Sequence, residues 1–104
     1  MTVSELDTAL KQALPGKIFE LAAPAGVKEY AVWHEYGAQL LIGDDVVQDE
    51  APRIQIDVIW QEDKSILPAV KTALSAAGQA YDVVEYGYDD EWASMRCILQ
   101  LEVA

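Results

Sequence analysis

The stretch RIQIDVIW, residues 53–60, decides the fold of this chain. Its residues alternate between an apolar series and a mostly polar one, with Ile54, Ile56, Val58 and Trp60 in the first and Arg53, Gln55, Asp57 and Ile59 in the second. A period of two is typical of a strand with one buried face. We therefore predict a strand at 53–60 that forms the centre of a sheet.

An acidic tract comes directly before this strand. Asp44, Asp45, Asp49 and Glu50 make the segment too charged to be buried, and it is too long to be a tight turn. We expect a negatively charged loop that projects from the sheet at about residues 38–51.

Size and charge limit the classes of function. The 104 residues predict a single domain, 1–104. Eighteen acidic residues against seven basic ones give a formal net charge of −11. Because no cluster of Lys and Arg is present to displace counterions from a phosphate backbone, we expect no direct sequence-specific binding of nucleic acid. No apolar run approaches the roughly 20 residues that span a bilayer, so no membrane segment is expected.

The remaining elements follow from periodicity and from turn residues. Thr2 and Glu5 have the spacing of a capping box, and a helix then runs to Pro15 and Gly16. Short strands are predicted at 17–21 and 30–36.

A second helix starts after Asp63 or Ser65 and ends at Gly78. Two strands at 81–88 and 94–103 follow, joined by a charged turn. The predicted fold class is α+β: a mixed, mainly antiparallel sheet of four to five strands with two helices packed on it, in the order α-β-β-β-α-β-β.

The sequence offers no motif for catalysis or for cofactor binding. The six glycines are scattered, without a phosphate loop or a nucleophile elbow, and the acidic pairs lack the ligand pattern of a calcium loop. We expect no catalytic residue, no cofactor and no metal. Cys97, in an alternating segment, is expected to be a small buried hydrophobe. The enzymatic alternative is a hydrolase that uses Cys97 as the nucleophile and His34 as the base.

Aromatic and acidic side chains are the candidates for interaction, because Tyr and Trp are common where a surface is both apolar and wet. We place one patch on the first edge strand and the face of residues 30–36, and a second on the hairpin around Tyr88 and Trp92. The candidate interaction residues are Tyr30, Trp33, Tyr36, Asp44, Asp45, Asp49, Glu50, Tyr88, Asp89, Asp90 and Trp92.

A family resemblance rests on the order of these features. After the first helix come Tyr30, Val32, Glu35 and Gly37, and then Gly43, Asp44 and Asp45. The strand with Ile54, Ile56, Asp57 and Val58 follows. A helix that ends near Gly78 then leads to Tyr81-Asp82, Glu85-Tyr86, an acidic turn and Trp92. This order resembles the small tail-completion (tail-terminator) and head–tail joining proteins of long-tailed bacteriophages and prophages, over nearly the whole chain.

The resemblance implies a non-enzymatic virion structural protein of the tail or neck. Such a protein assembles with copies of itself into a ring, typically a hexamer, and meets tail-tube and head-connector proteins at the head–tail junction after assembly in the host cytoplasm. The acidic loop would then border a passage for DNA and repel the duplex. The alternative from another class is an acidic adaptor or inhibitor that mimics the charge of DNA and binds a basic protein.

Overall fold

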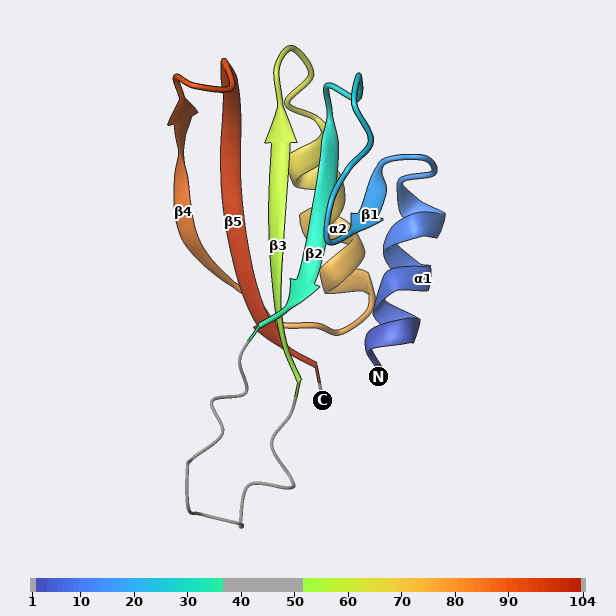
Figure 1. Ribbon diagram of the computed structural model, residues 1–104. Helices are drawn as coiled ribbons and strands as arrows, with labels where there is room; N and C mark the ends of the chain where they lie inside the picture. Colours follow the sequence, from blue (N-terminus) through green and yellow to red (C-terminus); the bar gives the residue numbers. More distant parts are fainter. Residues whose placement is uncertain (1, 37–51, 104) are drawn as a thin grey trace.

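Two helices and five strands follow one another in the predicted order α-β-β-β-α-β-β, which confirms the fold class (Figure 1). The computed structural model describes residues 2–36 and 52–103, so the loop predicted at 38–51 lies outside the described residues. The elements are α1 (Val3–Ala13), β1 (Ile18–Glu20), β2 (Tyr30–Glu35), β3 (Arg53–Trp60), α2 (Ile66–Ala76), β4 (Asp82–Asp89) and β5 (Ser94–Glu102).

The sheet has the strand order β1-β2-β3-β5-β4, which places β3 at its centre as the alternation predicts. β1 runs parallel to β2, and the other neighbouring pairs are antiparallel. In the register of the two central pairs, Ile56 lies opposite both Trp33 of β2 and Leu99 of β5. The last two strands form a hairpin, and β5 lies between β3 and β4.

Both helices pack on the same face of the sheet, and in the described part of the chain no helix covers the other face, called here the open face (Figure 1). Ile54, Ile56 and Val58 of β3 point toward the helices and are completely buried. Val70 and Leu74 of α2 are equally buried against them. The apolar residues that alternate along β3 and those at helical spacing along α2 therefore pack together in one core. Neither helix of the described chain is long and apolar enough to cross a membrane.

The predicted capping box begins α1. The hydroxyl of Thr2 accepts a hydrogen bond from the Glu5 amide at 3.1 Å, and the Thr2 amide donates to Glu5 Oε1 at 2.8 Å. The amide and hydroxyl of Thr2 lower the pKa of Glu5, because both favour the ionised carboxylate. At α2 the outcome differs: Ser65 occupies the capping position without a capping hydrogen bond from its side chain, and its own amide donates to Asp63 Oδ1 at 2.9 Å.

Glu29 fixes the connection between β3 and α2. Its Oε2 atom accepts hydrogen bonds from three successive amides, at 3.2 Å from Gln61, 3.0 Å from Glu62 and 3.3 Å from Asp63. These amide donors, with that of Glu62 the strongest influence, hold the pKa of Glu29 below its ordinary value. The residue before β2 is thereby attached to the segment that leads into α2.

Candidate interaction surface

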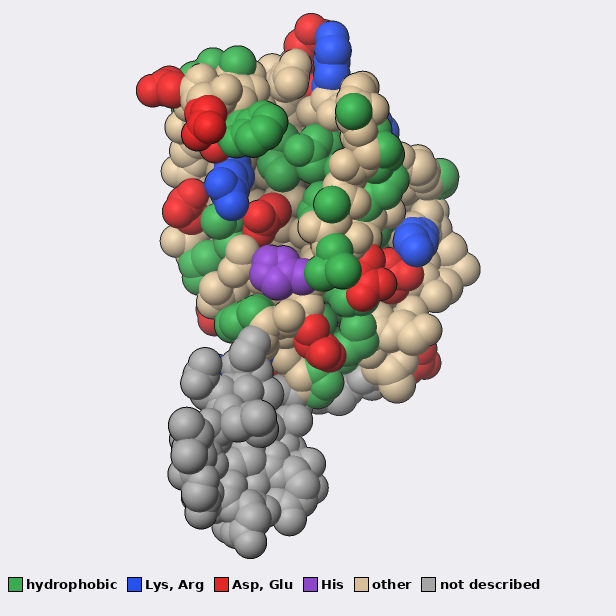
Figure 2. All heavy atoms as spheres, viewed as in Figure 1, with side chains coloured by type: hydrophobic (Ala, Val, Ile, Leu, Met, Phe, Trp, Pro, Cys, Tyr) green, Lys and Arg blue, Asp and Glu red, His purple; other side chains and the backbone are tan. Residues whose placement is uncertain are grey.

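The open face of the sheet carries a mixture of polar, acidic and hydrophobic side chains (Figure 2). The strand registers place alternate residues of neighbouring strands side by side on this face. The central strands contribute Tyr30, Val32 and His34 from β2, Gln55, Asp57 and Ile59 from β3, and Arg96, Ile98 and Gln100 from β5.

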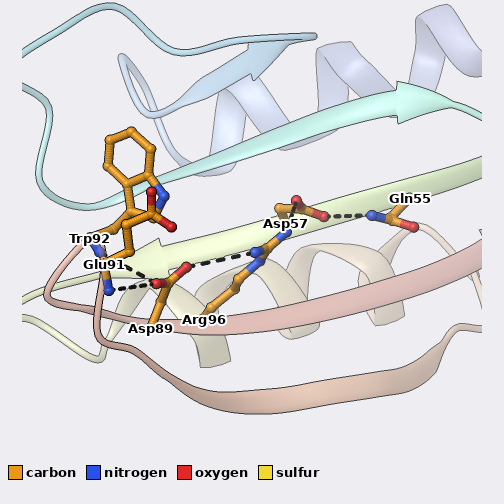
Figure 3. A network of polar contacts seen from close by, with 6 residues as sticks. All are labelled: Gln55, Asp57, Asp89, Glu91, Trp92 and Arg96. Carbon is orange, nitrogen blue, oxygen red and sulfur yellow. Dashed lines mark hydrogen bonds and ion pairs between the residues drawn. The ribbon is translucent and has the colours of Figure 1, made fainter.

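A network of polar contacts is centred on Arg96 (Figure 3). Its Nη2 atom donates to Asp57 Oδ2 at 3.1 Å, and its Nη1 atom lies 3.9 Å from Asp89 Oδ2. Gln55 donates to Asp57 Oδ1 at 2.9 Å, and Gln100 donates to Gln55 Oε1 at 3.2 Å. Because the Asp57 side chain is 19% exposed and that of Arg96 is 37% exposed, this pair is less screened by water than an ordinary surface ion pair.

The turn between β4 and β5 is held by Asp89. Its Oδ1 atom accepts hydrogen bonds from the amides of Glu91 at 3.0 Å and Trp92 at 3.3 Å. The next residue, Ala93, has a φ of 49°, in the left-handed region that lets the chain reverse direction. This local geometry presents the Trp92 side chain to solvent with 70% of its surface exposed.

A pocket lies between this turn and the neighbouring strands. Its lining combines the Arg96 network with two aromatic residues, and consists of Tyr30, Asp57, Ile59, Asp89, Trp92, Ser94 and Arg96. A second hollow shares Tyr30 and Trp92 and extends along residues 23–27. An exposed indole beside a half-buried tyrosine and an arginine is the composition found at the centre of protein–protein interfaces.

The structure joins residues that the sequence interpretation placed in two separate patches. Tyr30, Asp89 and Trp92 line one pocket. Tyr88 is exposed on the strand leading to the turn, and Asp90 is exposed in the turn itself. Tyr36 lines a different hollow, together with Arg53 and Tyr81. Four of the remaining five predicted residues, Asp44, Asp45, Asp49 and Glu50, lie outside the described residues.

Trp33 requires a correction, because it does not belong to this surface. It follows Val32 on β2, and successive side chains of a strand point to opposite faces. Trp33 therefore faces the helices, where only 7% of it is exposed, and its indole Nε1 donates to Asp7 Oδ1 of α1 at 2.8 Å. The side chain is part of the core and also attaches α1 to the sheet.

The Cys97–His34 pair of the hydrolase alternative is contradicted by the two faces of the sheet. Cys97 is fully buried on the face covered by the helices, opposite Val58. His34 lies on the open face, opposite Gln55. Burial raises the pKa of the Cys97 thiol, which disfavours the thiolate that a nucleophile requires. As expected from its alternating segment, Cys97 is a small buried hydrophobe.

Sequence reasoning missed the two central residues of the network, Asp57 and Arg96. The signal was present, since each is a charged residue in the middle of a strand and belongs to the polar series of its alternation. The pairing of β3 with β5, which brings them together, is not local and was not deducible from either strand alone. Within residues 2–36 and 52–103, no group of three or more His, Cys, Asp or Glu side chains is arranged to hold a metal ion.

Comparison with known proteins yields distant structural likenesses. No family model matches the chain, and no curated protein matches it in sequence. The chain is similar in structure to a Cs H-NOX mutant with 4-cyano-L-phenylalanine at site 5, with a TM-score of 0.45 and 12% identity over 96% of this chain and 43% of the other. It is similar to a mutant of the T. tengcongensis H-NOX, with a TM-score of 0.44 and 12% identity over 96% and 44% of the two chains. This chain thus spans less than half the length of these proteins, and the likeness assigns neither family nor function.

Proposed function

We propose that this chain is a non-enzymatic structural protein of a phage tail or neck, which forms or joins a ring at the head–tail junction. The observation that carries the proposal is the element order α-β-β-β-α-β-β with both helices on one face. The resemblance to tail-completion and head–tail joining proteins rests on this order of elements and implies a sheet flanked by two helices.

The pocket around Trp92 and Tyr30 supports a role in protein–protein contact. Trp92 is held outward by the hydrogen bonds of the turn, and the arginine beside it is already oriented by Asp57. A preorganised aromatic and arginine pair loses little conformational freedom when a partner binds. In the proposed role, this pocket receives an apolar side chain from another subunit or from a tail-tube or head-connector protein.

A ring places a further demand on the subunit. A head-to-tail interface uses two different patches, which close a circle only when the rotation between subunits divides it evenly. Because Tyr30 and Trp92 line the same pocket, the proposal assigns them to one of these patches. The net charge of −11 per subunit opposes closure at low salt, so ring formation should be favoured by higher ionic strength.

The test is to delete the reading frame from its phage or prophage and to examine the particles by electron microscopy. The proposal requires unjoined heads and tails, or tails of uncontrolled length, and normal infectious particles would refute it. Complementation with Trp92→Ala should fail to restore joined particles. Leu21→Ala, which truncates a side chain that is 74% exposed outside the pocket lining, is the matched control and should restore them.

The acidic adaptor or inhibitor is the second candidate, favoured by the acids exposed along β4 and its turn. Part of this charge is neutralised within the chain, since Arg96 contacts both Asp57 and Asp89. The adaptor or inhibitor hypothesis predicts that the chain binds a basic nuclease or polymerase. It also predicts that this binding is lost when Asp44, Asp45, Asp89 and Asp90 are replaced by Asn. The hypothesis of a ring-forming structural protein predicts that ring assembly depends on Trp92 more than on these acidic residues.

A further inference from the structure

β4 concentrates most of the large hydrophobic side chains that the described residues expose. Six such side chains are more than a third exposed, and four of them belong to this one strand: Val83, Val84 and Tyr86 at 49% each, and Tyr88 at 60%. Single exposed hydrophobic residues are normal on a protein surface, whereas a cluster on one element marks an interaction site.

The position of β4 explains this exposure. It is the last strand of the sheet, whereas α2 lies behind β2 and β3 and α1 lies beside β1, at the other end of the sheet (Figure 1). Val83, Tyr86 and Tyr88 lie opposite Leu99, Cys97 and Met95 of β5, which are the residues that face the helices. β4 therefore continues the apolar face of the sheet past the point where the helices cover it. The Tyr86 ring has one aromatic neighbour there, Trp60, at 5.9 Å between ring centroids.

The opposite side of the same strand is acidic. Asp82, Glu85 and Asp89 lie opposite Gln100, Ile98 and Ser94, on or beside the open face. Gly87 falls between the last two acids, and a Cβ atom added there would meet no heavy atom within 4 Å. The missing side chain leaves a hollow that is bounded mainly by carboxylates, and its lining is Glu85, Gly87, Tyr88, Asp89, Asp90, Glu91 and Arg96.

The free edge of β4 provides the third part of the surface. In the described chain β4 pairs only with β5, so its outer edge presents unpaired amide and carbonyl groups. Proteins usually protect such an edge with Lys, Pro or a bulge, and β4 contains no Lys and no Pro. Its protection is the irregularity between Val83 and Glu85, where Val84 is one residue in excess of β5. Residues 85–89 beyond it form a regular edge.

Charge decides between the two occupants that fit an edge strand. A second copy of β4 would bring a strand whose only charged residues are acids against another of the same kind, and like charges on paired strands are destabilising. A strand with Lys or Arg on one side and apolar residues on the other would complement β4, because its basic residues would meet the acidic side of β4 and its apolar residues would meet the apolar side. We propose that β4 binds an extended basic segment of a partner protein as an added strand, with a Lys or Arg of that segment in the hollow at Gly87.

This inference deepens the proposed function, because it names a surface and the chemistry of a partner for the same assembly protein. It is tested on the purified chain, independently of any phage particle. The probe is a fluorescently labelled nine-residue peptide of alternating Lys and Val, with both ends blocked. We expect saturable binding that weakens as salt is raised, and slower exchange of backbone amide hydrogens within residues 85–89 of the protein when the peptide is bound.

Two substitutions change the hollow at Gly87 in different ways. Glu85→Lys reverses a charge at the hollow, and Gly87→Val adds a branched side chain to the hollow, at a position where a Cβ atom meets no heavy atom within 4 Å. Each should weaken peptide binding about tenfold or more while the thermal midpoint changes little. Glu20→Lys makes the same charge change on an exposed residue of β1, at the other edge of the sheet, and should leave the binding of the peptide within about twofold of the original.

Peptide variants separate strand addition from simple charge attraction. A peptide of alternating Glu and Val should not bind, and a Lys–Val peptide with a central Pro should bind at least about tenfold more weakly, because Pro cannot donate to the added strand. Absence of binding by the Lys–Val peptide would overturn the proposal. Equal binding by the Glu–Val or Pro-containing peptide would also overturn it, as would dimerisation of the free protein through β4, detected by light scattering and abolished by Tyr88→Lys.

Discussion

Loss of the hydrogen bond between Trp33 and Asp7 should loosen the attachment of α1 to the sheet. The Trp33 Nε1 atom donates to Asp7 Oδ1 at 2.8 Å, and the indole itself is 7% exposed. A hydrogen bond to a charged group contributes about 1.5–3 kcal/mol when it is well shielded. The Asp7 side chain is 21% exposed and its other oxygen binds Lys11 at 2.9 Å, so we reduce the expected coupling free energy to about 1–2 kcal/mol.

A double-mutant cycle measures this coupling without the other effects of each substitution. The four proteins are the original chain, Asp7→Ala, Trp33→Phe and the double variant, each unfolded with urea and followed by far-ultraviolet circular dichroism. Trp33→Phe also removes buried surface, but the cycle cancels that loss. For a domain of this size, the expected coupling free energy is equivalent to a shift in melting temperature of about 5–15 °C.

Lys11→Met is the control, because it removes the exposed ion pair of Asp7 and leaves the indole hydrogen bond in place. It should change the free energy of unfolding by no more than about 0.5 kcal/mol. A measured coupling below about 0.3 kcal/mol would refute the reasoning. In that case α1 is held mainly by the packing of its apolar side chains, including the buried Leu6 and Leu10.

Three further predictions concern stability and reactivity. Because the pKa of Glu29 is lowered in the folded state, its contribution to stability is present above the unfolded pKa near 4.5 and is lost as the pH falls through the folded pKa. The difference in urea midpoint between the original chain and Glu29→Gln should therefore shrink on acidification. A difference that is independent of pH would contradict this. The buried Cys97 thiol, whose pKa is raised, should resist alkylation in the folded protein and react in guanidinium, as followed by mass spectrometry; rapid reaction of the folded protein would count against the assigned burial. Leu74→Ala should lower the free energy of unfolding by about 2–5 kcal/mol, because it leaves a cavity under α2. Thr72→Ala, on the exposed side of the same helix, should change that free energy by less than about 0.5 kcal/mol. Similar values for both variants would show that α2 does not pack as described.

The order of elements was accessible from the sequence because it depends on local signals. The spacing of Thr2 and Glu5 gives the start of α1, and the alternation of 53–60 gives β3 and its buried face. The burial of Cys97 follows from the same kind of alternation in β5. The strand order does not follow in this way, because insertion of β5 between β3 and β4 is settled by pairing between residues far apart in the chain.

The candidate surface was only partly predictable for the same reason. Trp92 was found from its place in a charged turn, and Tyr30 from its side of β2. The ion pair of Asp57 and Arg96 needs the register of β3 against β5, which neither strand specifies alone. The sequence predicts a strand at 81–88 and marks only its Tyr88 as an interaction residue. The exposure of Val83, Val84 and Tyr86 depends on how far the helices extend across the sheet, which the strand alone does not specify.

The irregularity at Val84 has an evolutionary consequence. Loss of one residue from a strand normally reverses the orientation of every side chain beyond the gap, and so exchanges interior for exterior. In β4, Val83 lies opposite Leu99 and Glu85 opposite Ile98, so Val84 has no counterpart in β5. A lineage that lost this one codon would keep the orientation of the strand on both sides of the gap. It would also straighten the free margin of the sheet, so natural selection can adjust how readily this margin recruits another chain by adding or removing a single residue.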